Sequence, residues 1–297
     1  MSCLVNQLSV KSLIDLRSPA ELEEDSLLHG SPVYEGMLNY DYDKKKQEWK
    51  EAGITSNGEI KAVDGMQGNG IGRKRFFVSL MSESLIKKGV FFRFRKRIRV
   101  SRWPHLYHNN LTFLPLLATP PHHRAKFQAL AWLFLSNFSR RAEKKVRAIF
   151  IDRINGGGLS LLNELVVDYS GREIIAVLKL MAEKSNYPIA LYCTAGKDRT
   201  GLITMLTLSV LGATDDEILA DYVLSDSAYK QIGDKKAMVV GLDQTGVDPE
   251  IFLRAKPHVM KDTIKYIRTT FGSINGFLDN YGFDESWRMR LRSSLLV

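Results

Sequence analysis

The most distinct hydrophobic pattern of the chain is a pair of apolar runs on either side of a short polar turn. The first run, YPIALYC over 187–193, is brief and opens with a proline, which is typical of a buried strand. The second run, TGLITMLTLSVLG over 200–212, is apolar almost throughout and ends at a glycine, as buried helices often do. We therefore predict a strand that ends near Cys193, a tight turn, and a helix that ends near Gly212.

Helical spacing of apolar residues recurs in the second half of the chain. It predicts two helices before and after Gly171 within 161–184, one helix within 215–226, and two more within 259–282. Helices outnumber the strands that we can identify. This balance predicts an α/β fold with a small central sheet flanked by helices.

The first part of the chain contains fewer regular patterns. The run SVKSLIDLRS predicts a short strand that leads into a loop, and Ser18, Pro19 and Glu21 predict the beginning of a helix. Residues 30–81 are polar, glycine-bearing and weakly periodic, so we predict a loop and lid-like insertion there. We expect one domain over 1–297, with loops and insertions at 30–142.

Composition is that of an ordinary globular enzyme-sized chain. Its 297 residues are 44% hydrophobic and 10% aromatic, which is enough to bury a substantial core. Two cysteines, Cys3 and Cys193, are too few for a disulfide framework or a metal site, so we expect a reducing compartment and no cofactor. No apolar run is long enough to span a membrane, which predicts a soluble, cytoplasmic protein.

The charge of the chain is concentrated in one block. The net charge is +9, and no aspartate or glutamate occurs between Ser84 and Ala142. Three explanations stay open: a basic arm that contacts an anionic membrane through residues 87–102, a surface insertion with no partner, or translated non-coding sequence. We predict no nucleic-acid binding, because no recognition motif accompanies the charge. We also predict no metal site among the scattered histidines of this block, which are His105, His108, His122 and His123.

The predicted turn at 194–199 has the chemistry of an anion-binding cradle. A strand, a tight turn and a helix N-terminus bring unpaired backbone N–H groups and the positive end of a helix dipole to one place. Cysteine thiols at helix N-termini and beside arginines form thiolates readily, which makes Cys193 a candidate nucleophile. Arg199 offers a planar fork that can pair with two phosphate oxygens. A nucleotide-binding loop is excluded, because Leu191 and Asp198 stand where that motif needs glycine and a hydroxyl residue.

The run CTAGKDRTG resembles the signature of the cysteine-dependent protein tyrosine phosphatases. Its Gly-Lys-Asp-Arg-Thr-Gly spelling is similar to the branch of bacterial secreted tyrosine and phosphoinositide phosphatases and their plant relatives. Three further segments agree with the resemblance: SLIDLRSPAELEED, DEILADYVLSD and the last helical region. Members of the family usually carry a histidine before the nucleophile, where this chain has Tyr192, and the effect of this difference on activity stays open.

The resemblance implies a phosphatase-like fold and a set of site residues. Cys193 would be the nucleophile, Arg199 would hold the phosphoryl oxygens, and Asp198 would donate the proton to the leaving group. Asp198 could instead cap the helix or orient Arg199, and Asp168 is a weaker alternative for the proton donor. The rest of the loop would contact the substrate phosphate; its residues are Thr194, Ala195, Gly196, Lys197 and Thr200.

The substrate would be a phosphorylated protein or a phosphoinositide. Lys197 adds a second cation, as in lipid phosphatases of the tensin-homologue type, although it could instead pair with a nearby carboxylate. Asp15 and Arg17 are expected to brace the loop through a buried ion pair or hydrogen bonds, with direct phosphate contact by Arg17 as the lesser alternative. Two other functions stay open: a catalytically impaired module that binds phosphate or phosphoinositide, and acyl transfer with His258 as the base.

Overall fold

The structure of the protein is a computed structural model that describes residues 9–23, 34, 37–54, 60–62, 72–81, 85, 140–231, 248 and 255–296. The chain divides into two compact units, one made of residues 1–82, 158–235 and 250–297 and the other of residues 83–157 and 236–249. All the residues of the predicted site belong to the first unit. One domain over 1–297 stays a prediction.

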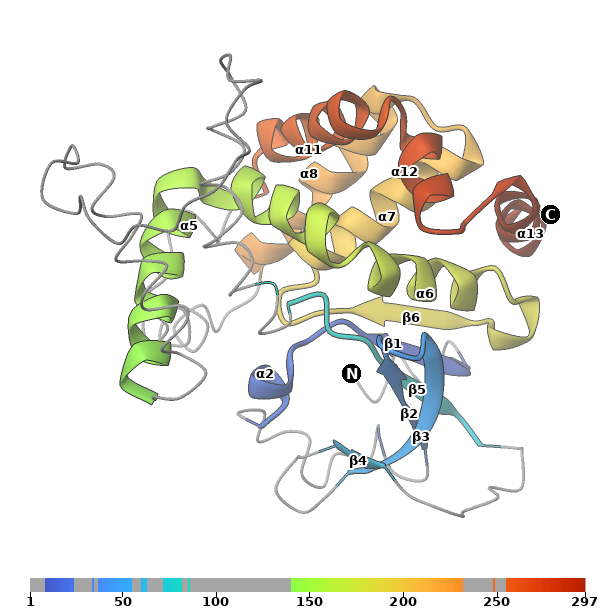
Figure 1. Ribbon diagram of the computed structural model, residues 1–297. Helices are drawn as coiled ribbons and strands as arrows, with labels where there is room; N and C mark the ends of the chain where they lie inside the picture. Colours follow the sequence, from blue (N-terminus) through green and yellow to red (C-terminus); the bar gives the residue numbers. More distant parts are fainter. Residues whose placement is uncertain are drawn as a thin grey trace, which may run out of the picture. The chain divides into compact units, whose positions relative to one another are not determined.

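A six-stranded mixed sheet forms the centre of the first unit, with the strand order β4-β3-β2-β5-β1-β6 (Figure 1). The strands are β1 (Ser12–Asp15), β2 (Leu38–Asp43), β3 (Glu48–Ile54), β4 (Ile60–Ala62), β5 (Lys74–Phe77) and β6 (Ile189–Tyr192). Strand β1 lies between β5 and β6, runs parallel to both, and is buried along its whole length. Asp15 at the end of β1 is in register with Tyr192 at the end of β6. The segments that follow these two strands therefore leave the sheet at the same edge.

Helix α7 (Asp198–Leu211) follows the loop that begins with Cys193, and several helices pack against it. The helices are α2 (Pro19–Glu23), α5 (Arg140–Tyr169), α6 (Gly171–Met181), the short 3-10 helix η2 (Lys184–Asn186), α7 (Asp198–Leu211), α8 (Asp215–Gln231), α11 (Pro257–Phe271), α12 (Ile274–Asn280) and α13 (Glu285–Leu295). Helix α7 contacts β6, and α6, α8 and α13 pack against α7. The predicted α/β fold, with a small sheet flanked by helices, is confirmed.

Helix boundaries follow from local chemistry. Helix α7 ends at Gly212, whose φ of 92° is left-handed and favours glycine, as the sequence predicted. Helix α6 begins at Gly171, where a Cβ atom would lie only 2.3 Å from the Tyr281 ring, so a side chain there would displace the aromatic ring. Within α5, the helix is interrupted at Gly158, which has φ 63°.

The prediction of a loop over 30–81 is wrong for the described part of that segment. Four strands, β2 to β5, lie within it, and β5 is inserted between β2 and β1. Strands β2 and β3 are only half-buried and carry polar residues among their aromatic ones, which hid their periodicity. Strand β5 begins Lys-Arg, and a buried arginine at this place is not expected from composition.

The basic block has almost no described residues. Residues 87–102 and the four histidines of that block lie outside the described ranges, so the membrane contact stays a prediction. Among the described helices, none is both long enough and apolar enough to cross a membrane.

Candidate active site

The loop 193–197 connects the end of β6 to the start of α7, which confirms the predicted strand, turn and helix. Gly196 adopts φ 62°, a left-handed conformation that other residues rarely accept. A Cβ at Gly196 would have no atom within 4 Å, so the constraint is conformational rather than one of space. The first turn of α7 presents backbone N–H groups that have no partner within the helix. The loop therefore has the backbone of an anion-binding cradle.

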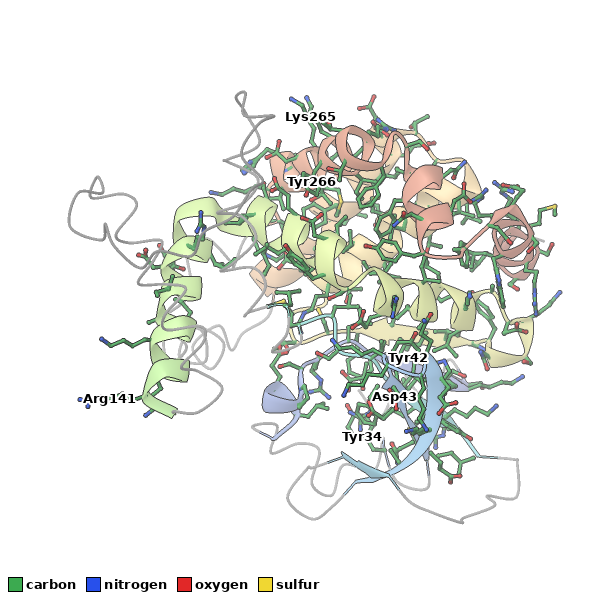
Figure 2. The ribbon with its side chains drawn as sticks, in the orientation of Figure 1. Tyr34, Tyr42, Asp43, Arg141, Lys265 and Tyr266 are labelled. Atoms are coloured by element: carbon green, nitrogen blue, oxygen red, sulfur yellow. The ribbon has the colours of Figure 1, made fainter. Side chains whose placement is uncertain are left out.

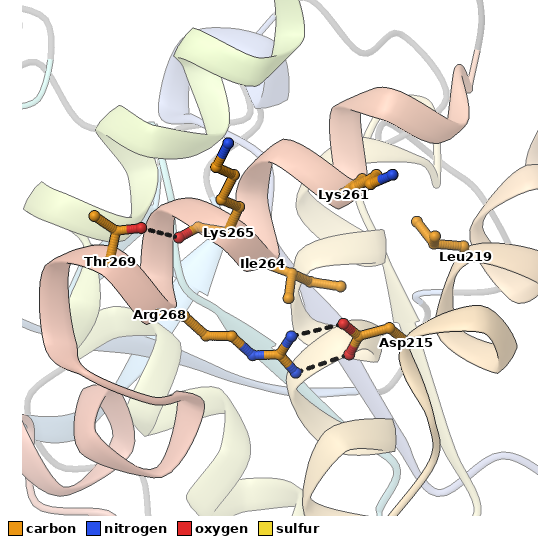
Figure 3. Close-up of a pocket in the computed structure, with 7 residues that line it drawn as sticks. All are labelled: Asp215, Leu219, Lys261, Ile264, Lys265, Arg268 and Thr269. Carbon is orange, nitrogen blue, oxygen red and sulfur yellow. Dashed lines mark hydrogen bonds and ion pairs between the residues drawn. The ribbon is translucent and has the colours of Figure 1, made fainter.

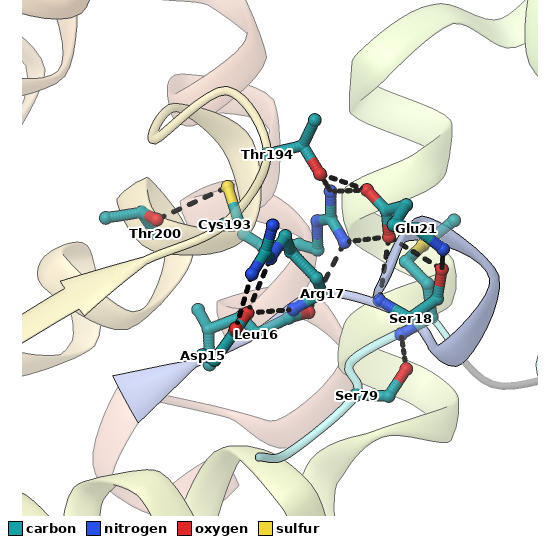
Figure 4. Close-up of polar contacts among 11 residues, drawn as sticks. Asp15, Leu16, Arg17, Ser18, Glu21, Ser79, Cys193, Thr194 and Thr200 are labelled. Atoms are coloured by element: carbon teal, nitrogen blue, oxygen red, sulfur yellow. Dashed lines mark hydrogen bonds and ion pairs between the residues drawn. The ribbon is translucent and has the colours of Figure 1, made fainter. Parts of the chain in front are cut away.

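Cys193 lies at the base of this cradle, directly after the last residue of β6. Its side chain is buried, with 7% of its surface exposed. The Thr200 hydroxyl, from the first turn of α7, donates a hydrogen bond to the Cys193 Sγ at 3.3 Å (Figure 4). A hydroxyl in this position stabilises negative charge on the sulfur.

Arg199 forms a bidentate pair with a carboxylate that the sequence analysis did not select. Its Nη1 and Nη2 atoms donate to the two oxygens of Glu21 at 2.7 and 2.6 Å. Nη1 also donates to the Leu16 carbonyl at 3.3 Å, and the Thr194 hydroxyl donates to Glu21 (Figure 4). Burial alone would raise the pKa of Glu21, but the Arg199 guanidinium and the hydrogen bonds outweigh it and lower the pKa to about 2. The fork of Arg199 is thus oriented by an ionised carboxylate.

Glu21 is itself fixed by the start of helix α2. The Ser18 backbone N–H and hydroxyl both donate to Glu21 Oε2 at 2.7 Å, and the Glu21 N–H donates back to the Ser18 hydroxyl at 3.3 Å. This reciprocal arrangement is a capping box of the form Ser-x-x-Glu. The motif is legible in the sequence as a helix start, but its link to Arg199 depends on tertiary structure.

A second carboxylate, Asp15, lies beneath the loop and is fully buried. Its oxygens accept hydrogen bonds from Arg17 at 2.9 and 2.8 Å, from Arg75 at 2.7 Å and from the Tyr192 hydroxyl at 2.9 Å. Burial raises the pKa of Asp15, but the two guanidinium groups outweigh it, so the pKa is lowered. The predicted brace by Asp15 and Arg17 is confirmed, and Tyr192, which replaces the usual histidine, is part of it.

Arg75 is the unexpected member of this buried cluster. It is fully buried, and its guanidinium carbon lies 3.8 Å from the ring centre of Tyr34 and 4.3 Å from that of Phe77. Its Nε and Nη1 atoms have no hydrogen-bond partner among the described residues. The aromatic faces therefore provide part of the stabilisation that hydrogen bonds provide elsewhere.

Lys197 and Asp198 form a pair at the start of α7. The Lys197 ammonium is fully buried and lies 3.5 Å from Asp198 Oδ2, while the Tyr222 hydroxyl donates to Asp198 Oδ1 at 3.0 Å. Burial raises the pKa of Asp198, although Lys197 and Tyr222 partly offset this. Burial lowers the pKa of Lys197. This geometry favours the alternative in which Lys197 pairs with a carboxylate over direct contact with substrate.

Two residues considered for other roles have different surroundings. Asp168, the weaker candidate for the proton donor, accepts a hydrogen bond of 2.8 Å from the Tyr266 hydroxyl on α11. His258 lies in the first turn of α11 and is exposed. No contact within the described part of the chain joins either residue to Cys193.

A separate hollow of about 390 Å³ lies between α8 and α11 (Figure 3). It is lined by Asp215, Leu219, Lys261, Ile264, Lys265, Arg268 and Thr269. None of the predicted site residues lines it. Its Arg268 fork is paired with both oxygens of Asp215, at 2.6 and 2.8 Å.

The cradle, the buried cysteine and the oriented arginine can be compared with known proteins. A model described as "Tyrosine phosphatase family" matches residues 121–297, which is more than half of the chain. The chain belongs to the tyrosine phosphatase family. The match covers the strand, loop and helix around Cys193 and Arg199.

Two curated relatives match shorter parts of the chain. "Triple specificity protein phosphatase PtpB" of Mycobacterium tuberculosis is 28% identical over 137 residues, which is 42% of this chain and 49% of that protein. "Putative tyrosine-protein phosphatase H16_A0669" of Cupriavidus necator is 34% identical over 91 residues, which is 29% of this chain and 32% of that protein. The chain thus aligns with about half of the first relative's length and about a third of the second's.

The family match begins after several residues that contact the loop or the residues next to it. Asp15, Arg17, Glu21 and Arg75 all precede residue 121, although they contact Tyr192, Thr194 or Arg199, or one another. Of these four, only Asp15 and Arg17 were predicted. The capping box was the available signal for Glu21, and nothing local distinguished Arg75.

Proposed function

We propose that the protein is a cysteine-dependent phosphatase that hydrolyses phosphate monoesters through a cysteinyl-phosphate intermediate. The observation that carries the proposal is the joint placement of Cys193 and Arg199 on one strand–loop–helix unit, with the arginine fork held in place by Glu21. The Gly-Lys-Asp-Arg-Thr-Gly spelling supports assignment to the branch of bacterial secreted phosphatases and their plant relatives.

In the first step, the thiolate of Cys193 attacks the phosphorus atom of the substrate. A sulfur–phosphorus bond forms, the phosphorus–oxygen bond to the leaving group breaks, and Asp198 gives its proton to the leaving oxygen. The raised pKa of Asp198, which burial causes, supports this role because the carboxyl keeps its proton to a higher pH than an exposed aspartate. Backbone N–H groups of 194–199 and the Arg199 fork would hold the other phosphoryl oxygens.

In the second step, a water molecule attacks the cysteinyl phosphate. The sulfur–phosphorus bond breaks, inorganic phosphate leaves, and the Asp198 carboxylate takes one proton from the water. The hydrogen bond from the Thr200 hydroxyl stabilises the sulfur as it leaves with its negative charge. The enzyme returns to its starting protonation state.

The substrate would carry phosphotyrosine, a phosphoinositide headgroup, or both. The name of the mycobacterial relative, a triple specificity phosphatase, supports testing more than one class. The buried position of Lys197 argues that selectivity for several phosphates would not come from this ammonium. We propose action in a reducing, cytoplasmic setting, with contact to an anionic membrane through residues 87–102 as a further possibility for lipid substrates.

One alternative function is favoured by a specific observation. Tyr192 replaces the family's usual histidine, and its hydroxyl is committed to Asp15. A protein in which this change slows thiolate chemistry would still bind phosphate through the loop and Arg199. The alternative is therefore a catalytically impaired module that binds phosphate or phosphoinositide.

A phosphate-release assay with Cys193→Ser tests the proposal. We expect the wild type to release phosphate from a phosphotyrosine peptide or a phosphoinositide, and the variant to lose turnover while it still binds vanadate. The backbone and Arg199, which make up the cradle, are unchanged in this variant. Cys3→Ser replaces the chain's other cysteine and serves as the matched control, with activity retained.

Two results would contradict this proposal. Turnover that survives in Cys193→Ser would exclude the covalent mechanism. A wild type that binds vanadate or inositol phosphates but releases no phosphate from any substrate would establish the binding module instead.

A further inference from the structure

Helix α8 contributes a tyrosine to the start of α7. Tyr222 is buried, with 3% of its surface exposed, and its hydroxyl donates to Asp198 Oδ1 at 3.0 Å. Burial raises the pKa of Tyr222, so the hydroxyl keeps its proton and remains a donor. Asp198 thus receives a defined hydrogen bond from a residue outside the phosphate-binding loop.

The last glycine of the signature makes this contact possible. A Cβ atom at Gly201 would lie 3.0 and 3.1 Å from two carbons of the Tyr222 ring, which is tighter than ordinary packing. Because Gly201 has no side chain, the ring of Tyr222 packs directly on the first turn of α7. This close approach places the tyrosine hydroxyl against Asp198, three residues earlier on the same helix.

The two oxygens of Asp198 have different neighbours. Oδ1 accepts from Tyr222, and Oδ2 lies 3.5 Å from the Lys197 ammonium. Because both oxygens lie beside donors, the hydrogen bond from Tyr222 and the Lys197 ammonium together fix the orientation of the carboxyl.

We propose that Tyr222 is a positioning residue for the catalytic acid, which holds the carboxyl of Asp198 in the orientation from which it delivers its proton to the leaving group. This inference rests on the proposed function and deepens it. Tyr222 acts through Asp198 and does not contact the reacting atoms.

The experiment compares two substrates that differ in how much they need an acid. The leaving group of 4-nitrophenyl phosphate departs with little protonation, whereas that of phenyl phosphate requires it. Tyr222→Phe removes the hydroxyl and keeps the ring over Gly201. We expect kcat for phenyl phosphate to fall about tenfold, the value of one hydrogen bond, and kcat for 4-nitrophenyl phosphate to change less than twofold.

A double-mutant cycle with Asp198→Asn identifies the route of the effect. If Tyr222 acts through Asp198, the double variant should have the rate of Asp198→Asn alone on phenyl phosphate. Tyr266→Phe is the matched control, because Tyr266 makes the same kind of bond to Asp168 on α5, away from the loop (Figure 2). It should leave both rates unchanged.

The pH profile of kcat gives a readout that simple destabilisation would not produce. The groups around Asp198 are Lys197 and Arg199 on its own segment and Tyr222 on α8, with Asp226 near Lys197 and Tyr222. The Tyr222 bond favours the ionised form of Asp198, so its loss should move the basic limb of the profile to higher pH, although the rate falls. Opening of the site to water would move this limb to lower pH.

Three outcomes overturn the inference, and they can be told apart. In the first, Tyr222→Phe has the wild-type rate on both substrates, and Asp198→Asn loses activity on phenyl phosphate. This result refutes the role of Tyr222 and leaves the proposed function unaffected. In the second, Tyr222→Phe lowers kcat equally on both substrates, and in the double variant this loss adds to that of Asp198→Asn. This result indicates that Tyr222 has a structural role only. Absence of turnover in the wild type refutes the proposed function and the inference with it.

Discussion

Two carboxylates bind arginines around the same loop, and their surroundings differ. Asp15 is fully buried and accepts from Arg17, Arg75 and Tyr192. The Glu21 side chain is 29% exposed and pairs with Arg199, whose side chain is 14% exposed. Both pKa values are lowered by arginine, in each case against the effect of burial.

The difference indicates that Asp15 supports the structure of the loop, whereas the Glu21–Arg199 pair takes part in function. A buried charge network is costly to disturb, because removal of one member leaves the others without compensation and without water. A partly exposed pair can exchange its partner, because the arginine can meet another anion and the carboxylate can be hydrated. We expect changes at Asp15 to appear mainly in stability, changes at Arg199 to appear mainly in catalysis, and changes at Glu21 to have a smaller effect on stability.

The largest effect is expected for Asp15→Asn. The variant keeps the shape of the side chain but leaves two guanidinium groups without a counter-charge, so the free energy of unfolding should fall by about 3–5 kcal/mol. Urea denaturation measures this change. Asp43→Asn is the control, because Asp43 is a partly exposed partner of Lys50 at the end of β2 (Figure 2), and its loss should be much smaller. Equal losses in the two variants would remove the distinction between scaffold and surface.

The next effect is expected for Arg199→Lys. Lysine keeps the charge but not the planar fork, so kcat/KM should fall by about tenfold to a hundredfold, which corresponds to about 1.4–2.7 kcal/mol. Unfolding should change little in comparison. Arg268→Lys alters another bidentate pair, with Asp215, far from the loop in sequence (Figure 3), and should leave the rate unchanged. An unaltered rate in Arg199→Lys would mean that the role of Arg199 is structural rather than catalytic.

The smallest effect is expected for Glu21→Gln, and it depends on pH. The pKa of Glu21 is lowered from 4.5 to about 2, so the ionised carboxylate stabilises the folded protein above about pH 4.5, and this contribution is lost as the pH falls towards 2. The variant lacks it at every pH. The difference in unfolding free energy between wild type and variant should be about 1–3 kcal/mol at pH 7 and should shrink in acid. A difference that stays constant down to pH 3 would contradict the assigned ionisation.

The parts of this site that could be predicted are those encoded within a few neighbouring residues. The strand, loop and helix around Cys193 follow from two apolar runs and a polar turn, and the Asp15–Arg17 brace lies within three residues. Glu21 was legible only as a helix cap. Its contact with Arg199 joins segments far apart in the sequence, and no local pattern contains that information.

Other parts could not be predicted because they depart from average behaviour. Strand β5 lies within the segment predicted to be a loop. It begins with two cationic residues and buries one of them, whereas arginine is usually exposed. Tyr222 occupies an apolar position of a helix, where an aromatic residue is ordinarily packing material. Its hydroxyl acquires a role only because Gly201 lets the ring come close.

The dependence of Arg199 on helix α2 has a consequence for how this protein can be divided or grafted. A fragment of residues 121–297 contains the whole cysteine signature and the whole family match, yet it lacks β1, α2 and the carboxylate that orients the arginine. Helix α2 spans only Pro19–Glu23, which is too short to form a helix in isolation. A free peptide with this sequence would therefore not restore the contact with Arg199. The cysteine signature could therefore be transferred to another chain as a short segment. The complete site could not, because it also needs the segment after β1, which the sheet holds beside β6.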